Sequence, residues 1–434
     1  MEAVETALRA AVLGAGASVL EEILTGVGVG RQGATVWCPC GRRMVSRGVK
    51  YKRLLTLLGY VWFGRSLFVC PRCGTTRFPG DESLGVVGTS RSPGVLRLVA
   101  RFAFKEPFKD ASKDMQDAAG VPISAKEVER IAEGLGEEME TWMGLTRLRA
   151  RPEYERDAGP PIEHMYIEFD GTGVPMVLPA LAGRKGKQPD GSAKTREAKL
   201  GCVFTQTTFD GAGRPVRDPG STSFVGAIED AHAFGTRMYD EAVRCGLYRA
   251  CRVTVLTDAA EWNKNTADTH FPMAQHIIDF FHGSEHITAL AKALHPSDAG
   301  HAQSHAEQWA GQLYDGKLQT IIEAVQDMLP KPQHRLKDAR GELAYFSKNA
   351  DRMRYDEYRA QGRFIGSGVI EAACKHVVGA RLKQSGMEWT VRGANAILAL
   401  RCAILSNRFE DFWEYRATPG NLLTYAITNA SNIA

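Results

Sequence analysis

The sequence has no uninterrupted run of the roughly 18 to 20 apolar residues that a membrane-spanning helix needs. Its first apolar stretch follows Glu2, Glu5 and Arg9, whereas a secretory signal begins with basic residues. We therefore expect a cytoplasmic protein with no membrane partner.

Several catalytic signatures are also missing. The chain contains no P-loop, no Rossmann glycine pattern and no Gly-x-Ser-x-Gly elbow, so nucleotide hydrolysis and serine chemistry have no motif. Nine cysteines in 434 residues are too few for a disulfide scaffold, and their number is odd. No repeat of fixed period is visible.

The composition is that of a folded chain, with 44% hydrophobic and 24% charged residues. A length of 434 residues predicts two or three modules rather than one core. The net charge of +4 is too small to identify a nucleic-acid partner, because such binding depends on where the charge lies.

Positive charge is concentrated in one short segment. From Cys38 to Arg77 there are nine basic residues and no acidic one. The segment begins with Cys38-Pro-Cys40-Gly and ends with Cys70-Pro-Arg-Cys73-Gly, and strand-like runs lie between the two pairs. Four thiolates are the ligand set of a tetrahedral structural zinc site, which a unit of this size needs for stability. We predict a zinc ribbon over 35–90, although the first pair is the tighter C-x-C.

Three helices are predicted between Pro93 and Leu145. Gly120-Val-Pro122 joins the second and third, and Ser124 with Glu127 forms a capping box at the start of the third. A short helix, a glycine turn and a capped helix are typical of a helix-turn-helix that reads DNA, but also of a plain helical hairpin between two domains. Both interpretations stay open for 91–150.

A polar, proline-rich stretch at 149–161 predicts a domain boundary. After it, the pattern indicates three strands, a helix, a strand, a helix and a strand, which is the order of an RNase H-like mixed sheet. Residues 283–363 carry helical patterns and no strand candidate, so we predict a helical insertion there. The predicted fold class is α/β: an N-terminal helix (1–34), the ribbon and the helical module, and then a catalytic domain formed by 160–282 and the C-terminal helices of 364–434.

Three acidic residues occupy positions where two metal ions could be held. Asp170 and Asp258 each follow a predicted strand, and Glu371 lies one turn into the helix that begins at Gly-Ser-Gly-Val-Ile. Two aspartates on neighbouring strands and a glutamate on a packed helix can bind two Mg²⁺ (or Mn²⁺) ions about 3.5 to 4 Å apart, an arrangement that performs phosphoryl transfer. We expect Asp170 to bridge both ions, with Asp258 and Glu371 each completing one.

The chain resembles the ISKra family of bacterial insertion-sequence transposases, which carry a DDE active site. The resemblance rests on YIEFDGTGVPM around Asp170, REAKLGCVF, TDAAEWN around Asp258, DFFHGSEH, the forty-residue segment around Glu371, and the paired cysteines. It implies an RNase H-like domain interrupted by helices, a divalent-metal site, and cutting and joining of the element's own DNA ends. It also implies a location at the bacterial nucleoid.

Related transposase superfamilies often carry an Asp or Cys, two residues and a His after the second aspartate, and Asp279-Phe-Phe-His282 fits that description. His282 then lies near the scissile phosphate, or else it is a strand-end residue packed on its own helix. The same stretch matches the H-x-x-E-H pattern of zinc peptidases through His282, Glu285 and His286. That alternative is less favoured, because it needs a distant third ligand and leaves the three acids unexplained.

Cations are the expected contacts to DNA phosphates. Lys375 lies one turn from Glu371 and is predicted to support the active site. In the buried segment 394–405 we expect only core packing, and Trp389 fits a core position better than a base-stacking one. The remaining predicted DNA contacts are basic residues of the ribbon and of the helix after Glu371: Arg42, Arg43, Lys50, Lys52, Arg53, Arg381 and Lys383.

The sequence thus predicts a transposase that acts on double-stranded DNA, with two Mg²⁺ ions and one structural Zn²⁺ as cofactors. Because two DNA ends must be brought together, we expect a homodimer or a larger assembly. The alternative is a DNA-binding protein without catalysis, derived from a transposase. All three acidic residues are present, which favours the enzyme.

Overall fold

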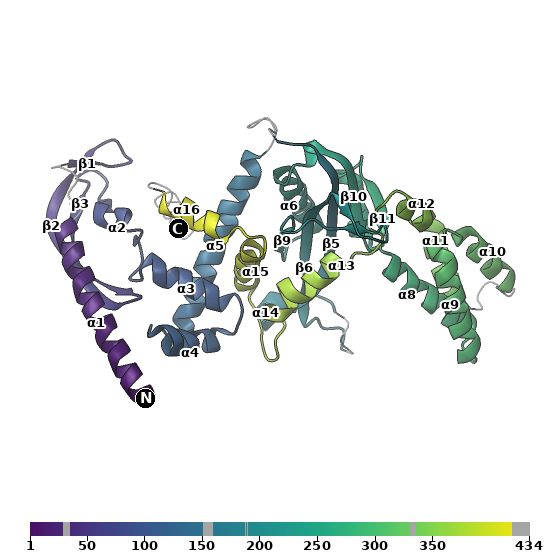
Figure 1. Ribbon diagram of the computed structural model, residues 1–434, viewed down its shortest axis with the longest axis horizontal. Coiled ribbons are helices and arrows are strands. Elements are labelled where there is room, and N and C mark those ends of the chain that lie inside the picture. Colours follow the sequence, from purple (N-terminus) through teal and green to yellow (C-terminus); the bar gives the residue numbers. More distant parts are fainter. Residues whose placement is uncertain (29–34, 151–158, 187, 189, 330–335, 419–434) are drawn as a thin grey trace. The chain divides into compact units, whose positions relative to one another are not determined.

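The computed structural model describes residues 1–28, 35–150, 159–186, 188, 190–329 and 336–418. The chain forms two compact units (Figure 1): unit 1 is Met1–Trp142 with Arg408–Ala434, and unit 2 is Met143–Asn407. Of the boundary predicted at 149–161, residues 151–158 lie outside the described part. The division between the units falls instead within the helix α5 (Ala125–Arg149).

Unit 1 contains a four-stranded antiparallel sheet in the order β1-β2-β3-β4. Its strands are β1 (Thr35–Trp37), β2 (Arg43–Thr56), β3 (Gly59–Val69) and β4 (Thr76–Arg77). The strand-like runs predicted between the cysteine pairs form β2 and β3, and the chain reverses between them where Thr56 pairs with Gly59. Gly59 has φ 121°, a conformation that favours glycine, and this explains the position of the turn.

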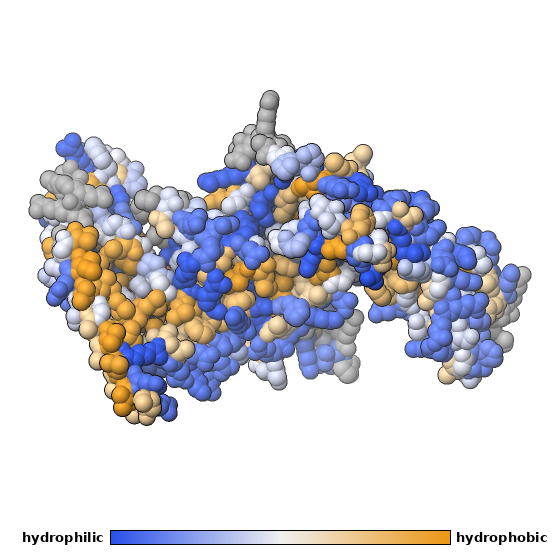
Figure 2. Space-filling view, in the orientation of Figure 1, coloured by the Kyte–Doolittle hydropathy of each residue, from blue (hydrophilic) through white to orange (hydrophobic). Residues whose placement is uncertain are grey.

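The helix α1 (Glu2–Val27) lies along the free edge of β3. A side-chain oxygen of Glu21 accepts the backbone N–H of Trp62 at 2.9 Å, so the helix satisfies a donor on the exposed strand edge. Ala17, Leu20 and Leu24 pack on the core beneath the hairpin. Figure 2 shows hydrophobic side chains along this helix. Among the described helices, α1 has the length and composition of a membrane span, although none of its residues in that window is buried.

The three predicted helices of unit 1 are present, preceded by a short one. They are α2 (Pro79–Ser83), α3 (Pro93–Ala103), α4 (Phe108–Ala119) and α5. Gly120 ends α4 in the left-handed conformation with φ 69°, and the Ser124 hydroxyl accepts the N–H of Glu127 at the start of α5. The turn that a helix-turn-helix requires is therefore present. A plain helical hairpin would contain the same turn, so both interpretations stay open.

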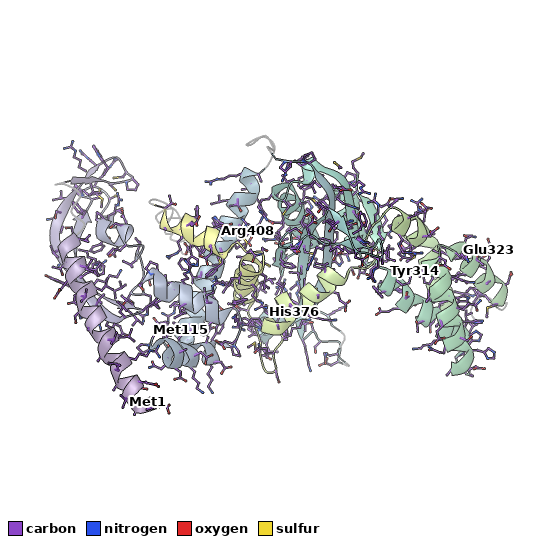
Figure 3. The ribbon with its side chains drawn as sticks, in the orientation of Figure 1. Met1, Met115, Tyr314, Glu323, His376 and Arg408 are labelled. Atoms are coloured by element: carbon purple, nitrogen blue, oxygen red, sulfur yellow. The ribbon has the colours of Figure 1, made fainter. Side chains whose placement is uncertain are left out.

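The last described helix, α16 (Phe409–Ala417), belongs to unit 1 and not, as predicted, to the catalytic domain. Its Arg416 forms an ion pair with buried Glu138 of α5 at 3.0 Å, and Phe412 packs edge-on against Trp142. Arg408, labelled in Figure 3, lies over the Trp142 ring at 4.5 Å. These contacts are not visible in the sequence because the partners are far apart along the chain, 278 residues in the case of Glu138 and Arg416.

Unit 2 is built on a five-stranded mixed sheet in the order β11-β10-β5-β6-β9. The chain order of three strands, a helix, a strand, a helix and a strand agrees with the sequence prediction, with a small hairpin (β7, β8) added. β5 pairs antiparallel with β6 and parallel with β10. The elements are β5 (Ile162–Pro175), β6 (Thr195–Gln206), β7 (Thr208–Phe209), β8 (Pro215–Val216), β9 (Ser223–Ala227), α6 (Ala231–Arg244), β10 (Ala250–Thr257), α7 (Glu261–His270) and β11 (Gln275–Ile278).

Asp170 was predicted to follow a strand, but it lies inside β5. Gly171 and Gly173 lie inside β5, which runs straight through them and pairs with β6 along its whole length. A Cβ at Gly171 would lie 2.3 Å from the carboxylate of Glu197, and one at Gly173 would lie 3.0 Å from Thr195. Glycine is needed there because side chains of the neighbouring strand cross close to the backbone, not because the chain turns.

The predicted helical insertion is present, and no strand occurs in its described residues. Its core around Trp309, Leu313 and Phe346 is continuous with buried residues of β10 and β11. Its first helix begins earlier than predicted, at Phe280. The elements are α8 (Phe280–Leu294), α9 (Ala299–Tyr314), α10 (Leu318–Met328), α11 (Lys337–Asn349) and α12 (Tyr355–Ala360).

The chain returns to the sheet through helices that follow the insertion. α13 (Gly368–Ala373) continues through a π-helical segment (Cys374–Gly379) into α14 (Ala380–Leu382). α15 (Val391–Leu405) contacts β9 and is buried along most of its length, as predicted for 394–405. A π-helical turn inside a helix is frequently found at functional sites.

Candidate metal centres

The four cysteines of unit 1 converge. Their sulfur atoms all lie within 4.8 Å of one another, with 3.4 Å between Cys38 and Cys73 and 3.5 Å between Cys40 and Cys70. All four are free thiols. Gly41 and Gly74, with φ of 82° and 72°, form the tight turns that follow the two pairs. This donor set and spacing fit a tetrahedral Zn²⁺ ion.

The surroundings of the sulfur atoms favour a thiolate at one position. Hydrogen bonds from the side chain and the backbone of Thr75 lower the pKa of Cys73 to about 6. Zinc binds thiolates and displaces their protons. A thiol with a lowered pKa therefore releases its proton at little cost in free energy when zinc binds. The cluster is therefore compatible with a structural zinc site.

Two of the three predicted acids lie next to each other on adjacent strands. Leu256 of β10 is the register partner of Glu168 of β5. Asp258 directly follows the end of β10, and its charge acts on Asp170. Neighbouring strands are about 4.8 Å apart, so the two carboxylates share one edge of the sheet. Burial raises the pKa of Asp170, and the charge of Asp258 raises it further.

Both aspartates are held in place by hydrogen bonds. An oxygen of Asp170 accepts the backbone N–H of Gly171 at 2.6 Å, and the thiol of Cys374 lies 3.8 Å from the other oxygen. One oxygen of Asp258 accepts the N–H of Ala260 at 2.8 Å and the side-chain amide of Asn263. Each carboxylate therefore keeps one oxygen bound to the chain.

Glu371 lies on the helix above this pair but turns away from it. Cys374, one turn along the same helix, reaches Asp170, whereas Glu371 forms a 2.7 Å ion pair with Lys375. The Glu371 side chain is 63% exposed. Among the described residues, the four cysteines are the one group of three or more metal-binding side chains with ligand atoms within 4.8 Å. The three acids are thus neighbours, but they are not assembled as a set of ligands.

The sequence analysis missed a buried glutamate directly beneath this site. Glu168 precedes Asp170 by two residues on the same face of β5 and has no exposed surface. One of its oxygens accepts the N–H of Ile370, in the first turn of α13, and the other has no hydrogen-bond partner among the described residues. Burial raises the pKa of Glu168 to about 8. It connects the strand that carries Asp170 to the helix that carries Glu371.

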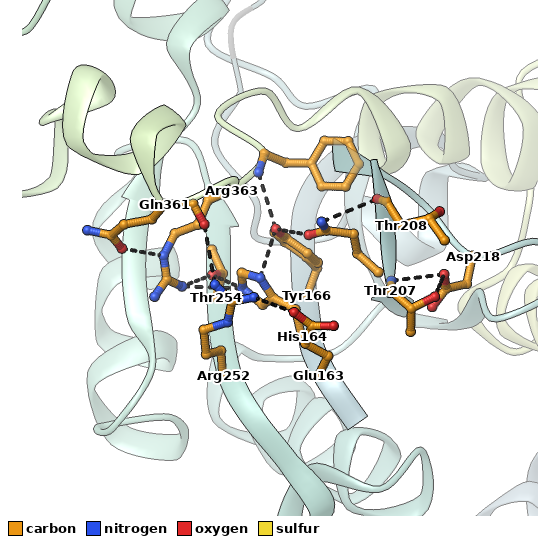
Figure 4. Close-up of polar contacts among 12 residues, drawn as sticks. Glu163, His164, Tyr166, Thr207, Thr208, Asp218, Arg252, Thr254, Gln361 and Arg363 are labelled. Atoms are coloured by element: carbon orange, nitrogen blue, oxygen red, sulfur yellow. Dashed lines mark hydrogen bonds and ion pairs between the residues drawn. The ribbon is translucent and has the colours of Figure 1, made fainter. Parts of the chain in front are cut away.

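A buried polar network continues along the same face of β5 (Figure 4). The hydroxyl of Tyr166 donates to Gln206 at 2.9 Å and accepts the N–H of Phe364 at 3.2 Å. Arg363 donates to Thr254 at 2.6 Å. These bonds attach the segment before α13 to the sheet and so fix where the helix of Glu371 begins.

This network left a signal in the sequence. In His-Met-Tyr-Ile-Glu-Phe-Asp, polar residues alternate with apolar ones, so the polar side chains share one face of the strand. His164 belongs to the same face, and burial lowers its pKa to about 3. A half-polar strand whose polar face is buried indicates a functional site, and the alternation could have revealed it.

Asp279 and His282 do not lie on a strand. β11 ends at Ile278, and Asp279 caps α8 by accepting the N–H of His282 at 2.6 Å. Asp279 also accepts the N–H of Ser367, so it joins the insertion to the segment that leads into α13. The His282 ring contacts Glu285 at 3.6 Å.

The residues of the peptidase-like pattern form a different contact. His286 binds Glu342 of α11 directly, at 2.6 Å, and stacks on the ring of Tyr345 at 3.8 Å. A histidine hydrogen-bonded to a carboxylate at this distance leaves no room for a metal between them. His282 and His286 with Glu342 are therefore not arranged as a zinc site.

The predicted DNA contacts differ in accessibility. Arg42, Arg43, Lys50 and Arg53 are exposed, and Lys383 is exposed while it contacts Thr172. Lys52 is not available, because its ammonium group is buried against Asp81 at 3.1 Å.

The remaining predicted contact, Arg381, is also unavailable. It has no exposed surface and lies over Trp389 at 5.1 Å. Trp389 is itself buried and donates its ring N–H to Leu382, so it occupies the predicted core position.

A basic cavity of about 400 Å³ opens beside Asp258, between α7 and α11. Lys264, Lys348 and Arg352 line it, together with Tyr345 and a single acid, Glu261. Lys348 has no ion-pair partner among the described residues. Such a cavity suits the anionic phosphates of a DNA strand next to the acidic pair.

No protein-family model matches the chain, and no curated protein matches it. Among solved structures, the chain is similar to the Drosophila P element transposase strand transfer complex. The sequences are 9% identical, the TM-score is 0.24, and the match covers 75% of this chain and 81% of that chain.

Proposed function

We propose that this protein is a DDE transposase with an RNase H-like catalytic domain in unit 2, which cleaves and rejoins DNA strands at the terminal inverted repeats of an insertion sequence. The observation that carries the proposal is the place of Asp258 at the end of β10, beside the strand β5 that carries Asp170, with the helix of Glu371 in contact with β5. The strand order, with an antiparallel β5-β6-β9 half and a parallel β5-β10-β11 half, supports the fold assignment.

Asp170, Asp258 and Glu371 would hold two Mg²⁺ (or Mn²⁺) ions. When bound, such a pair activates a water or 3′-hydroxyl nucleophile and stabilises the leaving 3′-oxygen. The chain provides the rest. Gly171 and Asn263 orient the two aspartates, and Glu168 holds the first turn of α13 so that Glu371 stays within reach.

Glu371 has to exchange its partner before it can act as a ligand. Its ion pair with Lys375 is exposed, and such pairs contribute about 0 to 1 kcal/mol, so little holds the carboxylate there. Once Glu371 turns toward the aspartates, Lys375 is released and can meet a DNA phosphate. His282, Lys383 and the basic cavity lie around the same site and would contact the DNA backbone.

Double-stranded DNA is the proposed substrate, both at the ends of the element and at the target. Unit 1, with its cysteine cluster and exposed cations, would bind the ends. Because two ends must be joined in one complex, we propose a homodimer or a larger assembly in the bacterial cytoplasm, at the nucleoid.

The test is Mg²⁺-dependent nicking of a plasmid that carries the element with its flanking DNA. Asp170→Asn, Asp258→Asn and Glu371→Gln should each lower the nicking rate at least about a thousandfold, or ~4 kcal/mol of transition-state stabilisation, with DNA affinity nearly unchanged. Glu323→Gln, an equally conservative change on α10 of the insertion (Figure 3), is the matched control and should cleave normally.

The alternative is a DNA-binding protein without catalysis, derived from a transposase. Its basis is the resting ion pair of Glu371, which leaves the acidic set incomplete. Wild-type protein that binds the plasmid but does not nick it with either Mg²⁺ or Mn²⁺ would establish this alternative. Full activity in any one of the three acidic variants would remove that residue from the site.

A further inference from the structure

Unit 1 exposes an unusual group of aromatic side chains on its hairpin. Tyr51 is 73% exposed, Trp62 50% and Tyr60 41%, and Arg53 is exposed beside them. We call Tyr51, Arg53, Tyr60 and Trp62 the aromatic patch. Large rings are normally buried for their apolar area, so several on one small surface mark a binding site.

The four side chains lie on one face of the sheet. Arg53 is the register partner of Trp62, and Leu55 is the partner of Tyr60. Residues opposite each other project on the same face, and so do residues two apart on one strand, such as Tyr51 and Arg53. The opposite face carries Leu54 and Phe63, which are buried in the core of unit 1. Tyr51 and Trp62 therefore face solvent with a sheet behind them, while Leu55 on the same face is buried where residues 90–92 bond to the strand.

The patch is cationic as well as aromatic. The guanidinium of Arg53 lies over the Tyr60 ring at 3.7 Å, whereas Lys50 is exposed on the opposite face of the same strand. The acidic residues nearest in sequence already form ion pairs with other basic residues. Asp81 pairs with Lys52 and Arg65, and Glu82 pairs with Arg77. The positive charge of the outer face is thus not neutralised by the hairpin's own acids.

We propose that the aromatic patch binds single-stranded DNA, with unpaired bases stacked on Tyr51, Tyr60 and Trp62 and with Arg53 against a backbone phosphate. Rings two residues apart on a strand are separated by about 6.7 Å, far enough for each to receive its own splayed base. Aromatic rings joined to cations are the surface that binds single strands without regard to sequence. A paired duplex cannot offer its base faces to them.

This inference goes beyond strand cleavage, because it assigns to unit 1 a second DNA form, distinct from the duplex proposed for the ends. The site is also far in sequence from the acids of unit 2. Its test needs no added Mg²⁺ and no catalysis, so it can succeed or fail independently of the proposed transposase activity.

The experiment measures the fluorescence anisotropy of a labelled 15-nucleotide oligo(dT) and of a duplex of equal length, with the full-length protein at one fixed salt concentration. Tyr51→Ala and Trp62→Ala should each weaken oligo(dT) binding roughly tenfold, with little change for the duplex. Trp62→Phe, which keeps a ring, should bind within about twofold of wild type.

Trp37→Ala is the matched control, because Trp37 is 61% exposed in the same sheet but outside the aromatic patch. It should leave oligo(dT) affinity unchanged. Zinc content and melting temperature confirm that each variant is folded. The proposal is overturned if Trp37→Ala weakens binding as much as Trp62→Ala, if the patch variants weaken duplex and single strand equally, or if wild type does not bind oligo(dT).

Discussion

The cysteine cluster of unit 1 and the acidic group of unit 2 differ in how far each is assembled. The four sulfur atoms already lie within 4.8 Å of one another, whereas Glu371 turns from the two aspartates to Lys375. A thiolate at Cys73 among thiols meets little repulsion, and a hairpin brings the cysteines together. Three carboxylates do repel, and the nearest available cation captures the most exposed of them. Ligand charge thus decides which site can form before its metal arrives.

The strongest test of this difference is to remove two cysteines. Cys70→Ser with Cys73→Ser should abolish binding of about one zinc per chain, because two ligands of the tetrahedral set are lost. Structural zinc contributes about 10 to 16 kcal/mol of apparent binding energy, so the β-sheet of unit 1 should unfold. Metal analysis and circular dichroism measure both effects.

Cys251→Ser provides the control, since Cys251 is an exposed free thiol of unit 2. It should keep zinc and fold. If the wild-type protein, purified without chelators, contains no zinc, the cysteine cluster is not a metal site. The contrast with the acidic group of unit 2 would then not hold.

A smaller effect is expected when Mg²⁺ is added to the acidic site. At ten times its Kd, an ion that binds only the folded state adds about 1.4 kcal/mol of stability. The melting temperature of unit 2 should therefore rise by a few degrees, beyond any change in KCl of equal ionic strength. Asp258→Asn should remove the rise. An equal rise in wild type and in this variant would show that the ions bind elsewhere.

A further effect concerns the pH dependence of stability. Glu168 has a folded-state pKa of about 8, above the value of about 4.3 in an unfolded chain. The folded state therefore holds the proton more tightly, so this residue's contribution is full below pH 4.3 and is lost as the pH rises toward 8. The melting temperature of the wild-type protein should therefore fall as the pH rises from 5 to 8.

Glu168→Gln keeps an acceptor for the N–H of Ile370 and has no proton to lose. Its melting temperature should fall less than that of wild type over the same range, by roughly several degrees. Thermal unfolding at pH 5, 6.5 and 8 gives the comparison. Parallel curves for the two proteins would mean that Glu168 does not titrate in this range.

Much of the sheet of unit 2 was predictable, because alternation and strand-end aspartates are local signals. The structural role of Gly171 could not be predicted, because it depends on Glu197 of the neighbouring strand. The same holds for Arg381, whose charge suggested DNA but which is buried against Trp389. A basic residue in sequence does not reveal whether its tertiary neighbours will cover it.

The candidate sites divide in the same way. The spacing of the cysteine pairs can be read directly from the sequence. The four cysteines converge in the structure, which agrees with the zinc prediction. The metal roles of Asp170, Asp258 and Glu371 stay predictions, since nothing in the chain alone orders Glu371 toward the aspartates. Glu168 was missed because its partner, Ile370, follows it only after the whole insertion.

The position of α16 has a consequence for how the molecule is made. Unit 2 is a single stretch of chain, but unit 1 needs Arg416 to meet Glu138. On a translating ribosome, unit 2 can therefore be finished before unit 1 receives its last helix. A message truncated near its end would yield a complete unit 2 attached to an unfinished unit 1.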